Sequence, residues 1–344
     1  MSSSAPNAPH NAPAIAVVSA ASTVVENESS RSLEEMLFDT TTAALTAAGL
    51  TAQDLDSIVL GANDQTDGRV ISIMAGTGPT GGVHRDTTMI ASSGDHALVY
   101  GYLRLKAGQG KNVLVVGWAK PSESVDPERA ELMSAEPFIL RQVGMNNTVA
   151  AALQASKWVD SGEESVSQSE LVAWPLSRKD LPGRGDTVHA IVLAVDGEFT
   201  AGSELAWIVD AGWATMSYEI GARDLTDLGS LHSALNQIAK RSPGASPENW
   251  DAVEIAGDSE PAVRAVLRAL PIRGEATVNP SGTLHEVLTS PFVAGLGRMT
   301  AAIRAVGQAG AEQKSRMTAG IGFNGFAGQG ATVMVFSSSK GDAA

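Results

Sequence analysis

Apolar residues along the chain fall into short uninterrupted runs and into stretches that carry an apolar face at helical spacing. Residues 14–19 form the first apolar run, and residues 56–61 predict a buried strand of a parallel sheet. Between these runs, Ser32 and Glu35 have the spacing of a capping box, in which the two side chains satisfy each other's backbone donors. Gly49 is placed to end a helix in the left-handed conformation. The pattern therefore predicts a helix that begins at the capping box and ends just before this glycine.

A second strand-and-helix unit follows, and the second half of the chain repeats the same plan. In the first half, the pattern predicts an extended segment at 87–90, a helix at 97–107 and a strand at 112–117. In the second half, it predicts a strand at 251–256, a helix at 291–306 and a strand at 317–321. We interpret this as two copies of one α/β unit, with a mainly parallel sheet covered by helices on both faces.

The remaining segments set the expected domain boundaries. Residues 1–13 contain Pro, Ser, Ala and Asn without the pattern of a secretory signal, which predicts a floppy tail. The repeated halves are placed at 14–118 and 187–337, and a second short tail is placed at 338–344. Residues 119–186 are richer in Pro, Ser and charge, and are interpreted as an inserted loop region with short helices, such as one at 146–159.

Composition and charge exclude several classes of protein. With 43% hydrophobic and 18% charged residues, the chain is neither disordered nor a coiled coil. Its 24 basic and 38 acidic residues give a net charge of −14, which argues against binding to nucleic acid or to an anionic membrane. The absence of cysteine excludes disulfides, thiolate zinc sites and a cysteine nucleophile, and no metal site is predicted. No apolar stretch is long enough to span a bilayer, so a cytoplasmic protein is expected.

Three motifs, taken in order, resemble the thiolase superfamily, and specifically its sterol-carrier-protein thiolase and lipid-transfer branch. They are Ala91-Ser-Ser-Gly-Asp-His-Ala97, then Asn279-Pro-Ser-Gly282 before a helix with Gly295-Leu-Gly-Arg298, and Gly320-Ile-Gly-Phe-Asn-Gly-Phe-Ala-Gly-Gln329 before the last strand. The resemblance covers about residues 14–337. It implies an α/β fold of two thiolase-like βαβαβ halves in five layers, α-β-α-β-α, and a protein that is usually dimeric.

At the family's catalytic positions, however, this sequence departs from the pattern. Superposing the first motif puts Ala91 where relatives carry the nucleophilic cysteine, and a methyl group cannot hold an acyl chain. The family's first histidine falls at Ala256, and its second cysteine at Gly320. The second histidine falls at Thr289, or at Ser290 if the neighbouring prolines are aligned. The resemblance therefore implies a thiolase-like chain that lacks the family's catalytic cysteines and histidines.

Neighbouring polar residues are the alternative candidates for chemistry. Ser92 and Ser93 have hydroxyls that need a positioned base, and His96 lies on the same predicted helix. We favour the simpler interpretation, a helix-start turn of small residues with an ordinary, partly buried histidine. A second candidate is an acid/base group for a retro-aldol reaction, made of Asp95, His285 and Glu286. Steroid side-chain aldolases resemble this branch and are thought to use tyrosines. None of the three tyrosines here, Tyr100, Tyr102 and Tyr218, falls in a predicted pocket loop.

Two groups of residues are candidates for binding a coenzyme A thioester, the ligand that the resemblance implies. Gly322 and Gly325 are candidates to present backbone N–H groups to a thioester oxygen, although a tight loop explains them as well. In the inserted region, a basic cluster near an aromatic residue is a candidate for a 3′-phosphate and an adenine, with incidental loop charges as the alternative: Trp174, Arg178, Lys179 and Arg184. No covalently bound cofactor is expected.

Loss of every nucleophile and base, with the fold motifs kept, predicts a non-catalytic subunit of an acyl-CoA-processing thiolase or acyltransferase complex. By resemblance, the expected partners are a catalytic thiolase-like subunit and a small OB-fold zinc-ribbon protein, in a dimer or hetero-oligomer. Two alternatives remain open: an acyl-CoA or steroid side-chain retro-aldolase, and a simple acyl-CoA binding protein.

Overall fold

A ten-stranded sheet runs through both halves of the chain in the computed structural model, which describes residues 12–27, 29–64, 71–162, 170–287, 290, 292–307 and 316–343. The strands lie in the order β10-β9-β11-β12-β8-β1-β7-β4-β2-β3. The first five belong to the second half of the chain and the last five to the first half. The two sets meet through only two residue pairs, Ala16 with Trp207 and Val17 with Ala206.

Each half contributes the same succession of elements. The first half comprises β1 (Ile15–Glu26), α1 (Leu33–Ala48), β2 (Ser57–Gly61), α2 (Ser72–Thr77), β3 (Asp86–Ile90), α3 (Gly94–Lys106), β4 (Asn112–Ala119) and β7 (Gly185–Val195). The second half comprises β8 (Ala206–Thr215), α6 (Gly229–Arg241), β9 (Ala252–Ile255), α7 (Glu260–Ala269), β10 (Thr277–Val278), α8 (Ala294–Gly307), β11 (Met317–Asn324) and β12 (Gly330–Ser337). The repeat predicted from the sequence is therefore present.

The sheet is mixed, which corrects the expectation of a mainly parallel sheet. Parallel pairing occurs between β2 and both β3 and β4, and between β9 and both β10 and β11. The last strand of each half is antiparallel to its neighbours: β7 pairs with β4 and β1, and β12 pairs with β11 and β8. The short loop between β11 and β12 explains the second case, because a tight hairpin can join only antiparallel strands.

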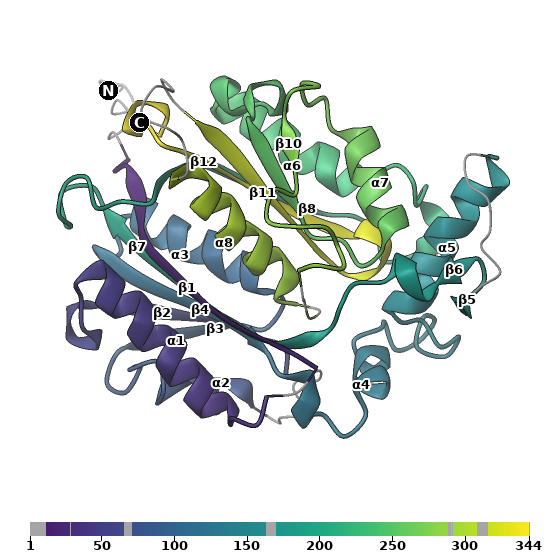
Figure 1. Cartoon of the computed structure of the whole chain (residues 1–344), viewed down its shortest axis with the longest axis horizontal. Coiled ribbons are helices and arrows are strands. Elements are labelled where there is room, and N and C mark those ends of the chain that lie inside the picture. Colours follow the sequence, from purple (N-terminus) through teal and green to yellow (C-terminus); the bar gives the residue numbers. More distant parts are fainter. Residues whose placement is uncertain are drawn as a thin grey trace, which may run out of the picture.

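Helices form three layers around the two parts of the sheet (Figure 1). Helices α3 and α8 lie side by side in the middle, where their apolar side chains form one core with the inner faces of the strands. Helices α1 and α2 cover the outer face of the first half, and α6 and α7 cover that of the second half. This arrangement confirms the predicted five layers.

The sequence signals at α1 are confirmed in detail. Ser32 Oγ accepts a hydrogen bond from the backbone N–H of Glu35 at 3.2 Å, and Glu35 Oε2 accepts from the N–H of Ser32 at 2.8 Å. Gly49 closes the helix with φ of 68°. Because only glycine adopts this conformation without strain, the helix ends where the sequence predicts.

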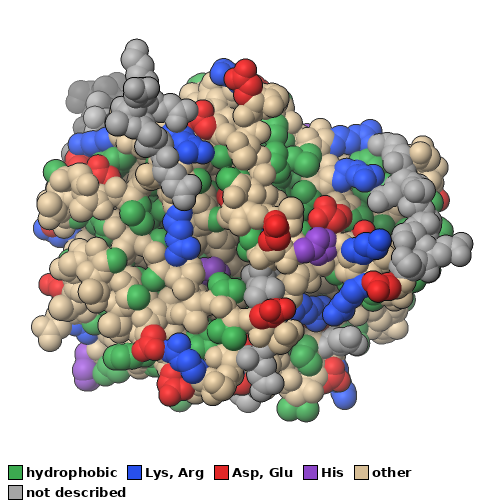
Figure 2. All heavy atoms as spheres, viewed as in Figure 1, with side chains coloured by type: hydrophobic (Ala, Val, Ile, Leu, Met, Phe, Trp, Pro, Cys, Tyr) green, Lys and Arg blue, Asp and Glu red, His purple; other side chains and the backbone are tan. Residues whose placement is uncertain are grey.

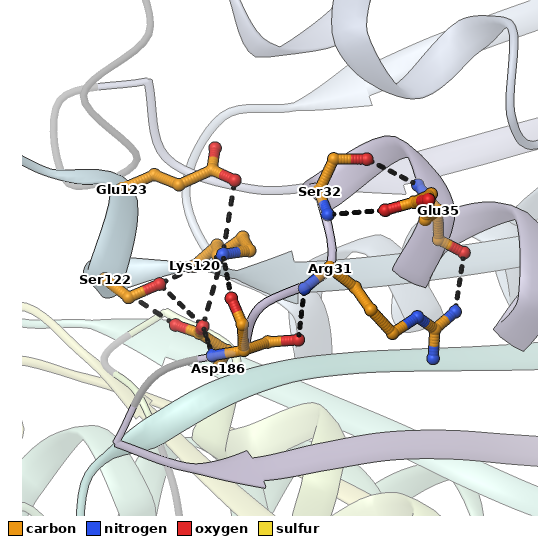
Figure 3. A network of polar contacts seen from close by, with 8 residues as sticks. Arg31, Ser32, Glu35, Lys120, Ser122, Glu123 and Asp186 are labelled. Atoms are coloured by element: carbon orange, nitrogen blue, oxygen red, sulfur yellow. Dashed lines mark hydrogen bonds and ion pairs between the residues drawn. The ribbon is translucent and has the colours of Figure 1, made fainter.

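A buried polar network fixes the start of β7 against the end of β4 (Figure 3). Lys120 and Asp186 are both buried, and Lys120 Nζ lies 3.3 Å from Asp186 Oδ2. Lys120 also pairs with Glu123 at 3.2 Å and donates to Ser122 Oγ at 3.0 Å. Asp186 accepts from the Ser122 hydroxyl at 2.6 Å and from the backbone N–H of Ser29 at 2.8 Å. The network therefore anchors the segment that leads into α1.

The inserted region lies at one end of the molecule (Figure 1) and carries α4 (Pro127–Met133), α5 (Asn147–Asp160) and a small hairpin of β5 (Leu171–Ala173) and β6 (Leu176–Ser177).

At the C-terminus, the described residues of the predicted tail fold back onto the protein. Lys340–Asp342 form a helical turn, and Ala343 is buried against the core beside α1. Of the predicted N-terminal tail, residues 1–11 lie outside the described residues. Among the helices that the structure describes, none is long and apolar enough to cross a membrane.

Candidate functional site

The carboxyl ends of β2, β9 and β11 open onto a cavity of about 340 Å³, which we call the strand-end pocket. Its polar lining consists of amides and carboxylates with a serine and a tyrosine: Asn63, Asn147, Asn324, Gln329, Glu131, Glu136, Asp258, Ser134 and Tyr218. Aromatic side chains complete the wall, among them Phe292 and Phe326. No lysine, arginine or histidine is part of the lining formed by described residues. The lining therefore includes three carboxylates, of which Glu131 is paired with Arg184 outside it.

Asp258 lines the strand-end pocket, and the pKa of its carboxyl group is raised. Burial raises its pKa to about 6, and the positive charge of Arg184 acts in the opposite direction. Sequence reasoning missed Asp258, although its place directly after the predicted strand at 251–256 was a usable signal. A carboxyl group of this kind can take up or release a proton near neutral pH.

Tyr218 also lines this pocket, which corrects the expectation that none of the tyrosines falls in a pocket loop. It follows β8, and no periodicity links that segment to the other pocket residues. Tyr102 is instead buried in the central core, where burial raises the pKa of its phenol well above the ordinary value. Tyr100 packs at the edge of the same core.

The start of α3 holds a chain of three polar side chains beside the strand-end pocket. Ala91 is exposed just before it, at the end of β3. His96 lies between two partners, with Nδ1 2.8 Å from Ser92 Oγ and Nε2 2.9 Å from Asn324 Nδ2. Asn324 is itself part of the pocket wall. Of the two serines that the sequence placed near His96, Ser92 makes the contact, and Asn324 is the member that the sequence did not reveal.

Asp95, a candidate acid or base, is buried in the interior. It lines neither the strand-end pocket nor the second large cavity, which lies between β1 and α8. Among the described residues, neither of its carboxylate oxygens has a hydrogen-bond partner. The carboxylate lies against two glycines, since a β carbon on Gly322 would stand 2.6 Å from Oδ2, and one on Gly295 would stand 2.8 Å from Cγ. Gly322 is therefore a close-approach position in β11, where it pairs with Thr332, and it does not line the strand-end pocket.

The structure does not bring the proposed acid/base group of Asp95, His285 and Glu286 together. His285 is exposed and faces Glu260 of α7, with Nε2 3.9 Å from Oε1. Glu286 is exposed, and hydrogen bonds from Thr283 lower the pKa of its carboxyl group. Its side chain lines a different pocket from the one beside α3. The three residues therefore cannot act as one unit, because they face separate parts of the surface and core.

Three other positions that were matched with the family's catalytic residues lie in the packed interior. Ala256 is buried at the end of β9. The Ser290 hydroxyl is buried and donates to the backbone carbonyl of Gly185. Gly320 packs against α8, where a β carbon would stand 2.8 Å from Met299 Cα. Thr289 lies outside the described residues.

A second cavity, of about 300 Å³, lies between the C-terminal part of β1 and α8. We call it the β1–α8 pocket. Ser22 and His189 face each other across β1 and β7, with Ser22 Oγ 2.9 Å from His189 Nδ1. Arg304 of α8 donates to the same Ser22 oxygen at 3.2 Å. Burial, and to a lesser degree the charge of Arg304, lowers the pKa of His189 to about 4. The imidazole is therefore neutral at physiological pH.

The basic cluster of the inserted region is only partly assembled. Trp174 is exposed at the turn between β5 and β6, and Arg178 and Lys179 are exposed on the helical turn that follows. Arg184 lies apart, 3.5 Å from Glu131 and in a small cavity that also touches Asp258. Figure 2 shows further Lys and Arg side chains gathered at this end of the molecule. Gly325, with φ of 67°, lines the strand-end pocket, and its role toward a ligand stays a prediction. Among the side chains that the structure describes, no cluster of His, Asp and Glu is suited to a metal ion.

Two structures of human mitochondrial 3-ketoacyl-CoA thiolase match the whole arrangement. The first has a TM-score of 0.71 at 15% sequence identity, covering 95% of this chain and 99% of the thiolase. The second, in complex with CoA, has a TM-score of 0.73 at 16% identity, covering 95% and 98%. The chain has the thiolase fold. No protein-family model matches the sequence, and a search of curated proteins finds no match.

The thiolase fold was predicted from the three motifs and from the repeated halves, and it is confirmed. A likeness at this level of identity concerns the fold, so the matching of Ala91, Ala256 and Gly320 to catalytic positions stays a prediction. Within the thiolase fold, polar side chains from both halves converge at the strand-end pocket and also at the β1–α8 pocket.

Proposed function

We propose that this chain is a thiolase-fold subunit that does not perform acyl transfer through a covalent intermediate. It would work beside a catalytic thiolase-like subunit, with a small OB-fold zinc-ribbon protein as a further partner, in the cytoplasm. The observation that carries this proposal is the environment of Ala91. An exposed methyl group follows β3 in the turn that leads to α3, and a chain without cysteine has no thiolate to take its place.

The surroundings of the other matched positions support the proposal. A thiolase needs a base beside its nucleophile, but Ala256 has no titratable group, and the Ser290 hydroxyl is already bound to a backbone carbonyl. Gly320 has no room for a cysteine side chain. A pocket persists at the strand ends, which supports retention of a ligand. Because one matched human thiolase structure contains CoA, we propose an acyl-CoA as that ligand, with Trp174, Arg178 and Lys179 near its nucleotide end.

The first test is an assay of the purified chain with acetoacetyl-CoA and CoA. We expect no thiolysis, and no acyl adduct in the intact mass of the protein. The second test is isolation of the tagged chain from its own cells. It should co-purify in a fixed stoichiometry with a thiolase-like chain that retains the Cys-x-Ser-Gly-x-x-Ala motif. Thiolysis by the chain alone, or a homo-oligomer with no such partner, would contradict the proposal.

A second candidate function, a retro-aldol lyase acting on an acyl-CoA, is favoured by one pair of observations. Asp258 and Tyr218 line the same pocket, and the pKa of the Asp258 carboxyl group is raised to about 6. A base and a phenol facing one ligand are groups that a retro-aldol cleavage requires. Cleavage of a β-hydroxyacyl-CoA that is lost in both Asp258→Asn and Tyr218→Phe, but not in Glu286→Gln, would establish this function over the subunit role.

A further inference from the structure

The β1–α8 pocket is separate from the strand-end pocket, because the described residues that line the two cavities have no member in common. It plays no part in the function proposed above. Its volume of about 300 Å³ lies within the range of small-molecule sites. Two of its polar groups, on Arg304 and Thr187, lack the partners that such groups usually have in a folded protein. These two groups indicate what kind of ligand the pocket accepts.

Arg304 is a cation without a counter-charge at one end of the pocket. Its guanidinium group donates to two neutral oxygens, the Ser22 hydroxyl at 3.2 Å and the Ala20 carbonyl at 3.4 Å. Among the residues that the structure describes, no carboxylate pairs with it. Although Arg304 is exposed at the edge of the pocket, the surrounding protein removes enough water to lower the pKa of the guanidinium group. A carboxylate bound at this end would gain a charge-assisted hydrogen bond.

The other charged side chains that line the pocket lie at its opposite end. Arg298 pairs with the buried Glu254 at 2.9 Å and donates to the backbone carbonyl of Thr283 at 3.3 Å. The N–H of Thr283 donates in turn to Glu286 at 2.8 Å. Arg304 lies six residues beyond Arg298 on α8, which is about 9 Å along the helix axis. Only the Arg304 end of the pocket therefore attracts an anion.

Thr187 contributes an unpaired hydroxyl to the floor of the pocket. It lies two residues from His189 on β7, so both side chains point to the same face of the sheet. That face is turned toward α8, because Ser22, which pairs with His189, contacts Arg304. Thr187 is buried, and its hydroxyl oxygen has no partner in the described part of the chain. Two residues of a strand span about 7 Å, which places this hydroxyl well inside the pocket from the Arg304 end.

The space between these polar groups is lined mainly by apolar side chains. They are Val24 of β1, Ala294 and Ala301 of α8, and Leu284 and Val287 of the segment before α8. Contact with a hydrocarbon chain would remove their apolar surface from water, which is favourable. A phosphate ion bound to the guanidinium group would leave the same surface uncovered. The lining therefore favours a carboxylate with an apolar body over an inorganic anion.

We propose that the β1–α8 pocket binds a small apolar monocarboxylate whose carboxylate pairs with Arg304, and whose chain carries a ketone oxygen that accepts a hydrogen bond from Thr187. The ligand is held and not transformed. The proposal concerns a cavity that is separate from the strand-end pocket, so it does not depend on the subunit role. Neither a missing thiolase-like partner nor thiolysis by the chain would affect it.

The first experiment measures the binding of octanoate at pH 7 by calorimetry. We expect saturable binding to the wild type, and Arg304→Gln should weaken it at least about tenfold, as for the loss of a charged hydrogen bond. Arg273→Gln removes the same charge at an exposed position outside the pocket and should have no effect. Octanamide, which has the same chain without the charge, should bind the wild type and Arg304→Gln equally weakly.

A second variant locates the bound octanoate. Ala301→Leu places a larger side chain in the middle of the β1–α8 pocket and should abolish binding, while its melting temperature shows that it is folded. The proposal would be overturned if octanoate did not bind the wild type. It would also be overturned if octanoate bound Arg304→Gln or folded Ala301→Leu as tightly as the wild type, since the ligand would then occupy another site.

The second experiment tests the hydroxyl of Thr187. Of three octanoates with a ketone at carbon four, five or six, at least one should bind the wild type about three- to tenfold more tightly than octanoate. Thr187→Val keeps the shape of the side chain without the hydroxyl. It should abolish this advantage and leave the affinity for octanoate unchanged.

The unliganded Thr187→Val protein supplies an independent readout. Loss of an unpaired buried hydroxyl should leave its melting temperature unchanged or raise it. A lower melting temperature would show that the hydroxyl already has a stabilising partner, which would refute its assignment to a ligand. Absence of any ketone advantage in the wild type, or an advantage that persists in Thr187→Val, would refute it as well.

Discussion

The carboxylate of Asp95 lies directly against Gly322, so close that a β carbon at Gly322 would stand 2.6 Å from Oδ2. This contact joins the start of α3 to β11 at the centre of the molecule. The carboxylate is buried and makes no hydrogen bond with the part of the chain that the structure describes. A charge in this position lowers stability, because water is removed and no partner replaces it.

We therefore expect Asp95→Asn to raise the free energy of unfolding by about 1 to 3 kcal/mol. Urea denaturation at pH 7 measures this change. Asp160→Asn, at an exposed position near the end of α5, is the control and should alter stability by less than about 0.5 kcal/mol. A loss of stability in Asp95→Asn would mean that the carboxylate has a stabilising role that its contacts do not reveal.

Cysteine should be tolerated at one of the two positions matched with family cysteines and not at the other. At Gly320, a β carbon would stand 2.8 Å from Met299 Cα and 2.7 Å from its Cγ, so backbone must move. We expect Gly320→Cys to lower the free energy of unfolding by about 3 kcal/mol. Ala91→Cys, at an exposed position, should be nearly neutral and still give no thiolysis, since Ala256 and Ser290 supply no base at the positions matched with the family histidines. Equal stability of the two variants would show that Gly320 has more room than this geometry allows.

Two groups with shifted pKa values should make opposite contributions to acid stability. His189 has a pKa of about 4 in the folded protein, below its ordinary 6.5, so the unfolded chain binds more protons and stability falls as pH drops through that range. Asp258 has a pKa of about 6, above its ordinary 3.8, so the folded protein binds more protons and stability rises as pH drops. Over the shared range, the two contributions largely cancel.

Asp258→Asn should remove the opposing contribution and expose that of His189. Between pH 6.5 and 4, the free energy of unfolding of this variant should fall by about 3 kcal/mol more than that of the wild type. This figure follows from about 1.4 kcal/mol for each unit by which a pKa is shifted. The mirror variant, His189→Gln, should instead gain stability toward acid relative to the wild type. Denaturant titrations at several pH values provide the comparison. Parallel pH profiles for all three proteins would exclude these assignments.

The Lys120–Asp186 pair should respond as a buried ion pair does. Asp186→Asn leaves the buried ammonium of Lys120 without its closest buried counter-charge, and we expect a loss of about 3 kcal/mol in the free energy of unfolding. Asp196→Asn is the matched control. It breaks the exposed pair with Lys340 and should cost less than about 1 kcal/mol. If the two substitutions cost the same, the network in Figure 3 does not contribute as a buried unit.

Much of the fold follows from signals that act over a few residues. The capping box at Ser32 and the glycine at position 49 fix α1, and the apolar runs predict β2 and β4, because caps and periodicity depend on neighbours in the chain. The direction of β7 and β12 did not follow from these signals, since pairing direction depends on how distant segments return to the sheet.

The candidate site divides in the same way. The sequence by itself determined that no cysteine exists, that small and polar residues precede α3, and that His96 lies within reach of Ser92. Only the tertiary structure decided that Asn324, 228 residues away, completes that contact. It also brought Asp258 and Tyr218 into one pocket and separated Asp95 from His285 and Glu286. The physical reason is that spacing along a helix is set locally, whereas the neighbours of a strand end are set by the packing of the two halves.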